Sequence, residues 1–98
     1  MSLSPRMSAQ VEKLAMHWPE WWSWDLELTP HLMKRMVDRQ FNEVDLRLML
    51  DDAIGYHENE EEGRFVIQTK HEGREWEVIV EPAHDERALV VVTAYSLD

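Results

Sequence analysis

The residues best suited to chemistry lie in one predicted helix near the middle of the chain. The stretch from Thr29 to Arg39 carries His31, Arg35 and Arg39 at four-residue intervals. At about 100° per residue, these three side chains fall within about 80° of one another on the helix surface. A histidine can transfer protons near neutral pH, and a guanidinium binds two phosphate oxygens and stabilises charge that develops during transfer. The spacing therefore indicates a site for a phosphodiester.

A hydroxyl pair closes the last predicted strand, which covers residues 87–95. Strict alternation predicts two faces, one with Leu89, Val91, Thr93 and Tyr95 and the other with Val90, Val92 and Ala94. The two hydroxyls can orient a phosphate or hydrogen-bond a catalytic group. Ordinary structural roles stay open as well. A basic helix face is often solvated or paired with acids, here those of residues 58–62, and a tyrosine after a valine run often borders a core.

Composition and charge limit the choice of function. The 98 residues suit one small domain, and the absence of cysteine excludes disulfides, thiolate catalysis and cysteine-ligated zinc. Residues 1–40 carry five basic and five acidic side chains, whereas residues 41–98 carry five and fifteen, which gives the net charge of −10. Tight non-specific binding to nucleic acid normally needs a basic protein. Any contact with RNA must therefore depend on a local positive site.

Several other features predict absences. No apolar run reaches the roughly 18 residues that span a bilayer, and the N-terminus lacks a signal-peptide layout, so we expect a cytoplasmic protein. The acidic stretch after His57 fixes no ligand geometry, so we expect no metal and no cofactor. His71 falls at a predicted hairpin turn and His84 in a loop, and both are expected to be exposed.

Hydrophobic periodicity predicts an α+β fold with N-terminal helices packed on one face of a three- to four-stranded antiparallel sheet. Helices are expected over residues 8–17, 30–40 and 43–54, and strands over 24–28, 64–70, 74–81 and 87–95. The last strand is apolar on both faces and should be central and covered on both sides. We divide the single domain 1–98 into a disordered N-terminus at 1–7, whose first residues could be a cloning remnant, a Trp-rich segment at 8–28 and a core at 29–96.

Four tryptophans crowd the Trp-rich segment, at Trp18, Trp21, Trp22 and Trp24. Such a cluster can be a platform on which bases or sugars stack. It can equally enlarge a thin core or form a dimer contact. No basic residues are interleaved with the rings, which favours the second pair of roles.

The chain resembles a widespread bacterial family of unknown-function domains. The resemblance covers about residues 29–96 and depends on His31-x-x-x-Arg35-Met36-x-x-Arg39, the acidic start of the next helix, three strands and the closing Thr93-Ala94-Tyr95. That family groups with the barnase–EndoU–colicin–RelE ribonucleases, many of which are toxins of toxin–antitoxin systems. The strongly acidic charge and the Trp-rich segment depart from that pattern.

The resemblance implies a RelE/barnase-like sheet against helices and a metal-independent endoribonuclease that works by 2′-hydroxyl attack. By position, His31 would be the acid or base, Arg35 and Arg39 would bind phosphate, and Thr93 and Tyr95 would orient the scissile group. RNA and an antitoxin-like protein would be the partners. The alternative is a non-catalytic module of the same fold that binds protein or forms a homodimer through its tryptophans.

Overall fold

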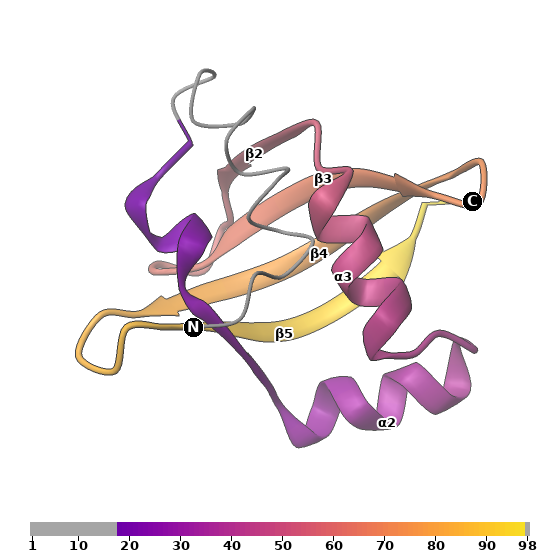
Figure 1. The fold of residues 1–98 in the computed structure, drawn as a ribbon, viewed down its shortest axis with the longest axis horizontal. Helices are drawn as coiled ribbons and strands as arrows, with labels where there is room; N and C mark the ends of the chain where they lie inside the picture. The colour runs from indigo at the N-terminus through magenta and orange to yellow at the C-terminus, as the bar shows by residue number, and fades with distance from the viewer. Residues whose placement is uncertain (1–17, 98) are drawn as a thin grey trace.

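The computed structural model describes residues 18–97, and the expectations for residues 1–7 and for a helix over 8–17 lie outside this range. The elements follow in the order η1 (Glu20–Ser23), β1 (Asp25–Leu28), α2 (Pro30–Asp38), α3 (Glu43–Asp51), β2 (Gly55–Glu58), β3 (Phe65–His71), β4 (Arg74–Ala83) and β5 (Ala88–Ser96). Both α-helices lie on the same side of the sheet (Figure 1). No helix in the described range has the length and apolar character needed to cross a bilayer.

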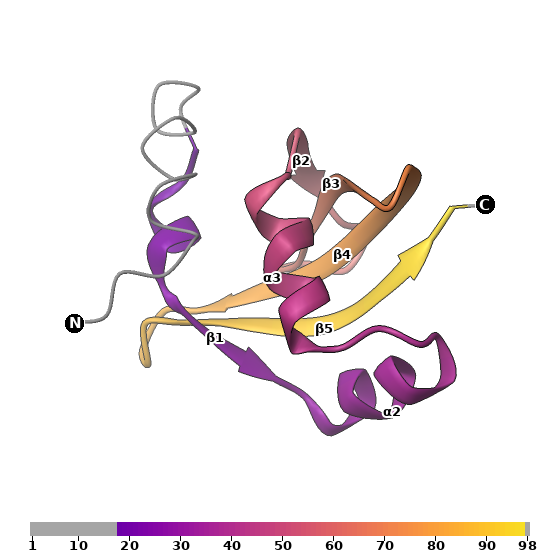
Figure 2. The same cartoon turned by 45° about the vertical axis from the view of Figure 1, so that its right-hand side comes forward.

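The sheet is mixed and has five strands in the order β1-β5-β4-β3-β2, so the predicted three- to four-stranded antiparallel sheet is wrong. Strand β1 pairs with β5 in parallel, with Leu26 opposite Leu89, whereas the other neighbours are antiparallel. Figure 2 shows β1 running beside β5. The long connection through both helices and three strands returns the chain in the same direction, which the alternation within β1 does not encode.

Two further expectations about the layout are corrected. The helices lie in sequence between β1 and β2 and do not precede the sheet. Residues 55–58, for which no strand was predicted, form the edge strand β2, whose exposed Tyr56, His57 and Glu58 suit a sheet edge. Strand β5 lies inside the sheet, between β1 and β4, as its apolar character predicts, and β4 is the middle strand of the five.

One face of the sheet packs against the helices and forms the core. Thr69 of β3 is 2 % exposed and its hydroxyl donates to the main-chain carbonyl of Met49 in α3, which identifies the covered face. Side chains of β4 and β5 on that face are buried, among them Trp76, Val78, Val80, Leu89 and Val91. The opposite face carries Glu75, Glu77 and Glu81 of β4, which are exposed or partly exposed, and Ile79 among them is 7 % exposed.

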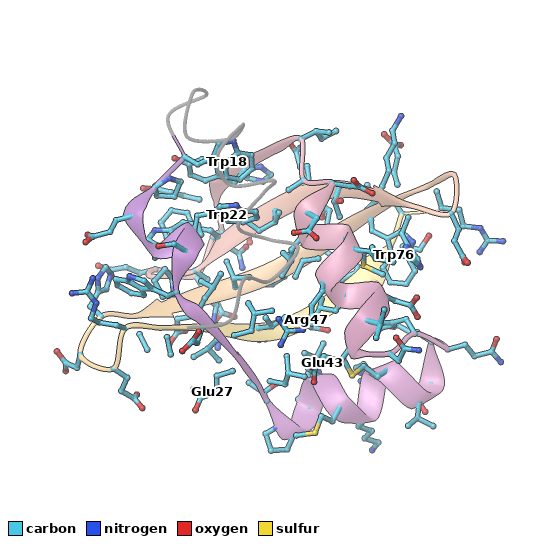
Figure 3. The ribbon with its side chains drawn as sticks, in the orientation of Figure 1. Trp18, Trp22, Glu27, Glu43, Arg47 and Trp76 are labelled. Atoms are coloured by element: carbon cyan, nitrogen blue, oxygen red, sulfur yellow. The ribbon has the colours of Figure 1, made fainter. Side chains whose placement is uncertain are left out.

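The tryptophan cluster belongs to the core. Trp18, Trp21, Trp22 and Trp24 are all less than 9 % exposed, and Trp22 is the largest side chain with almost no exposure. The rings of Trp18 and Trp22 lie 4.5 Å apart, and Figure 3 shows them side by side. The rings enlarge the thin core of a small domain, and little of their surface is free to stack on a base or to contact a second chain.

Strand β5 contains a β-bulge that changes which side chains share a face. Val91 pairs with Val80 and Thr93 with Ile79, so two steps along β5 match one step along β4 and Val92 is the extra residue. The buried side of β5 therefore continues from Val91 to Ala94. The predicted face that joined Leu89 and Val91 to Thr93 and Tyr95 is wrong, because the bulge turns both hydroxyls to the face opposite the helices.

Candidate active site

Helix α2 is joined to the free edge of β5 at both of its ends. Thr29 caps the helix by accepting from the Leu32 amide, and its hydroxyl lies within donating distance of the Val91 and Val92 carbonyls. At the other end the Arg39 guanidinium donates to the Ala94 carbonyl at 2.7 Å. These bonds continue the contact along β5 past the end of β1, and the Thr29 amide also donates to the Val91 carbonyl at 3.4 Å.

The basic helix face and the hydroxyl pair therefore lie on adjoining elements. We call this region the α2–β5 seam and define it by His31, Arg35, Arg39, Thr93 and Tyr95. Leu32 is fully buried and Met36 partly, so α2 packs on the core through these two residues, while the exposed His31 and half-exposed Arg35 lie on one flank of that contact.

Arg39 and Tyr95 are the seam residues that the structure brings together. Arg39 binds the carbonyl of the residue before Tyr95, and its charge acts to lower the phenol's pKa. Three stronger effects oppose it. Burial, then the hydrogen bond that the phenol donates to Glu77 Oε1 at 2.7 Å, and then the negative charge of Glu77 raise the pKa of Tyr95 to about 12. The phenol is therefore a protonated hydrogen-bond donor across the physiological range.

The other seam residues are less constrained. Among the described residues His31 has no hydrogen-bond or ion-pair partner, and Arg35 reaches Asp38 at 3.5 Å in an exposed pair. Thr93 is partly exposed and pairs with Ile79 in the sheet. His31 and Arg39 are separated by about 12 Å of helix, with Arg35 one turn from each. The seam therefore runs along one side of α2, and His31 at one end is too far from Arg39 at the other for the two to contact each other.

A pocket of about 280 Å³ lies past the C-terminal end of α2. Its lining joins the α2–α3 loop to the β3–β4 hairpin and consists of Arg39, Gln40, Phe41, His71, Glu72, Arg74 and Trp76. Only Arg39 among these was a predicted site residue. The expected exposure of His71 is wrong, because its side chain is 12 % exposed and lies beside Asp45 at the start of α3.

Sequence reasoning also missed Thr29 and Glu77 as partners of the seam. A threonine ahead of Pro30 is recognisable from the sequence as a helix cap, but nothing in a cap motif reports a second bond to a strand far along the chain. Glu77 lies opposite Tyr95 in the β4–β5 register. The bulge conceals that pairing from any argument based on simple alternation.

These observations define a class of small α+β domain, with a mixed five-stranded sheet, helices on one face and a basic helix along the last strand. The chain belongs to the family described as Domain of unknown function (DUF4258), whose model matches residues 28–96. The predicted membership of an unknown-function family is confirmed, but this description names no ribonuclease or toxin. No curated protein and no solved structure matches the chain.

Proposed function

We propose that the chain is a metal-independent endoribonuclease of the toxin type and that the α2–β5 seam is its active site. The observation that carries this proposal is the bond between Arg39 and the Ala94 carbonyl, at 2.7 Å. It holds the basic face of α2 beside the segment that carries Thr93 and Tyr95. A phosphate at the seam would meet guanidinium groups from the helix and hydroxyls from the strand, which is a suitable donor set for a phosphodiester.

The roles follow from side-chain chemistry. In the reaction the ribose 2′-oxygen attacks the adjacent phosphorus and the bond to the 5′-oxygen breaks, so one proton leaves the nucleophile and one reaches the leaving group. His31 transfers protons, since imidazole does so near neutral pH. Arg35 and Arg39 bind the phosphate oxygens. Thr93 orients the scissile group, and the phenol of Tyr95 donates its one O–H to that group by turning away from Glu77 when the substrate binds.

The test is RNA cleavage by the purified chain in the presence of EDTA. We expect His31→Ala and Arg35→Ala each to lower the cleavage rate at least 100-fold, since removing a proton-transfer group or an electrostatic partner has effects on the order of 100-fold. Both side chains are outside the core, so the circular dichroism spectra of these variants should match that of the wild type.

Two matched controls use the same residue types or the same helix. His57→Ala removes an exposed histidine from the edge strand β2, and Lys34→Ala removes an exposed cation from α2. Both variants should cleave RNA like the wild type. Cleavage that persists in His31→Ala and Arg35→Ala, or that disappears equally in the two controls, would exclude the seam as the active site.

Exposed apolar side chains on the helices favour a second candidate function, a non-catalytic module that binds protein. Val37 on α2 is 78 % exposed and Val44 on α3 is 65 % exposed, and Met33 and Leu48 repeat the pattern one turn away on their helices. Under this alternative the chain shows no nuclease activity and associates through its helices. Analytical ultracentrifugation of the wild type and of Val37→Lys distinguishes the two, because only a helix-mediated assembly would dissociate in the variant.

A further inference from the structure

The pocket between the α2–α3 loop and the β3–β4 hairpin is basic in a strongly acidic protein. Arg39 and Arg74 contribute two guanidinium groups against one lining acid, Glu72, whose side chain is 82 % exposed, while the His71 imidazole lies between Glu72 and Asp45. The whole chain carries twice as many acids as bases. A local excess of cations on such a background marks a place where an anion is held.

The charge of Arg74 is not paired with any acid in the described part of the chain. Its guanidinium group has no hydrogen-bond or ion-pair partner within residues 18–97, even though acids are abundant on the same hairpin. Arg39 uses one guanidinium nitrogen for the Ala94 carbonyl and has other N–H groups left. The guanidinium groups of Arg39 and Arg74, which come from different elements, therefore line the same pocket.

A buried tryptophan forms part of the pocket wall. Trp76 is 8 % exposed, and within the described part of the chain its indole Nε1–H has no hydrogen-bond partner. Native structures rarely leave such a donor unpaired, but this atom has almost no accessible surface, so Trp76 contributes the wall of the pocket and not a donor to its contents. The rings of Phe41 and His71 pack near Trp76, with centroids at 5.4 Å and 6.2 Å, and hold it in position.

We propose that this pocket binds a phosphate monoester through the guanidinium groups of Arg39 and Arg74, with the Trp76 ring in its wall. A tetrahedral dianion offers oxygen acceptors in several directions, which suits donors that come from a loop on one side and a hairpin on the other. A volume of about 280 Å³ is at the small end of the range for ligand pockets. The monoester could be a free nucleotide or the terminal phosphate of an RNA strand, and the proposal holds whether or not the seam cleaves RNA.

The first test measures binding of inorganic phosphate and of a nucleoside 5′-monophosphate to the full chain by calorimetry and by NMR. Among the indole N–H signals of the five tryptophans, the one that disappears in Trp76→Phe should shift most on titration. Arg74→Ala should weaken binding at least tenfold, and since Arg74 is exposed the variant should fold. Arg87→Ala, which removes an arginine 71 % exposed at the β4–β5 turn, is the matched control and should bind like the wild type.

The second test separates the two sources of phosphate. Short RNA strands of one sequence are compared with a 5′-phosphate and with a 5′-hydroxyl end. Tighter binding of the phosphorylated strand than of the nucleotide supports an RNA end, and binding of the nucleotide alone supports a free metabolite. Three results would overturn the phosphate assignment: measurable binding of the two strands with the same affinity, no effect of Arg74→Ala on binding, or the same affinity for a dicarboxylate as for phosphate. Because Arg74 is not a seam residue, these results are independent of the cleavage test.

Discussion

Tyr95 is the residue whose chemistry the fold changes most clearly. Its hydroxyl is partly buried and donates to Glu77, and Arg39 only partly offsets the rise in pKa that follows. A phenol in this state cannot act as a base near neutral pH. In the proposed reaction its one O–H therefore turns from Glu77 to a phosphate oxygen, and proton abstraction falls to His31.

The pKa of Tyr95 can be measured directly, because the chain has only one other tyrosine, Tyr56. In a Tyr56→Phe background, ultraviolet titration of the phenol should give a pKa of about 12. Glu77→Gln should lower this value, because both the acceptor and its negative charge favour the protonated phenol. Burial is the larger cause, so the pKa should stay above the ordinary value of 10.0. An unchanged pKa in Glu77→Gln would contradict the hydrogen bond.

The same shift has a consequence for stability at high pH. The pKa is higher in the folded chain than its ordinary value, so the folded state holds this proton more tightly. The stabilising contribution is complete below about pH 10 and is lost as the pH rises from 10 to about 12. The free energy of unfolding should therefore fall over that interval, and it should fall less steeply in Tyr95→Phe. Urea unfolding at stepped pH measures both slopes.

At the level of elements, Thr29 determines how α2 lies against β5. One hydroxyl caps the helix and also reaches two carbonyls beyond the end of β1. Thr29→Ala should lower the free energy of unfolding by about 1–3 kcal/mol, since it removes a cap and the bonds of the hydroxyl to two strand carbonyls. Thr29→Ser keeps the hydroxyl and should cost less than about 1 kcal/mol. Urea unfolding checks both, and equal losses in the two variants would contradict a role for the hydroxyl.

The sequence predicts elements better than it predicts how they join. The caps at Thr29 and Asn42 and the alternation around Trp76 depend on neighbours a few residues away, and helices α2 and α3 and strands β3 to β5 form close to their expected bounds. The parallel pairing of β1 with β5 depends on residues more than 60 positions apart. No local pattern reports such a contact, so the prediction of a purely antiparallel sheet was wrong.

For the candidate site too, local features could be predicted from the sequence and contacts between distant segments could not. The helical spacing of His31, Arg35 and Arg39 follows from local periodicity, and the structure places His31 and Arg35 on one flank of α2. The side of the sheet that Thr93 and Tyr95 occupy depends on a bulge that forms against β4. The basic pocket joins a loop and a hairpin about 30 residues apart, so its members could not be grouped from the sequence.

At the scale of the whole molecule, the tryptophans allow a chain of 98 residues to bury a core beneath a five-stranded sheet. Trp22, at 2 % exposure, contacts the rings of both Trp18 and Trp21. Removing such a side chain leaves a large cavity, and the loss is expected to be about 3–5 kcal/mol. That is a large fraction of the roughly 5–15 kcal/mol that stabilises a typical domain.

Trp22→Ala should therefore lower the thermal unfolding temperature sharply or abolish cooperative unfolding. Trp22→Phe keeps an aromatic ring in the core and should be the milder change. Val37→Ala, at a side chain 78 % exposed, is the control and should leave the unfolding temperature nearly unchanged. Calorimetry measures all three, and a stable Trp22→Ala variant would show that the ring cluster does not support the core.

The extra residue in β5 makes the length of that strand as informative as its composition. Deleting Val92 would remove the bulge, and Thr93, Ala94 and Tyr95 would keep Ile79, Val78 and Glu77 as their partners in plain alternation. If Val92 stayed but paired in plain alternation, the phenol would turn toward the tryptophan-rich interior and Ala94 toward water. In related chains, a one-residue gap at this point would therefore keep the phenol beside the basic helix, whereas an added residue that β5 does not bulge out would turn it inward.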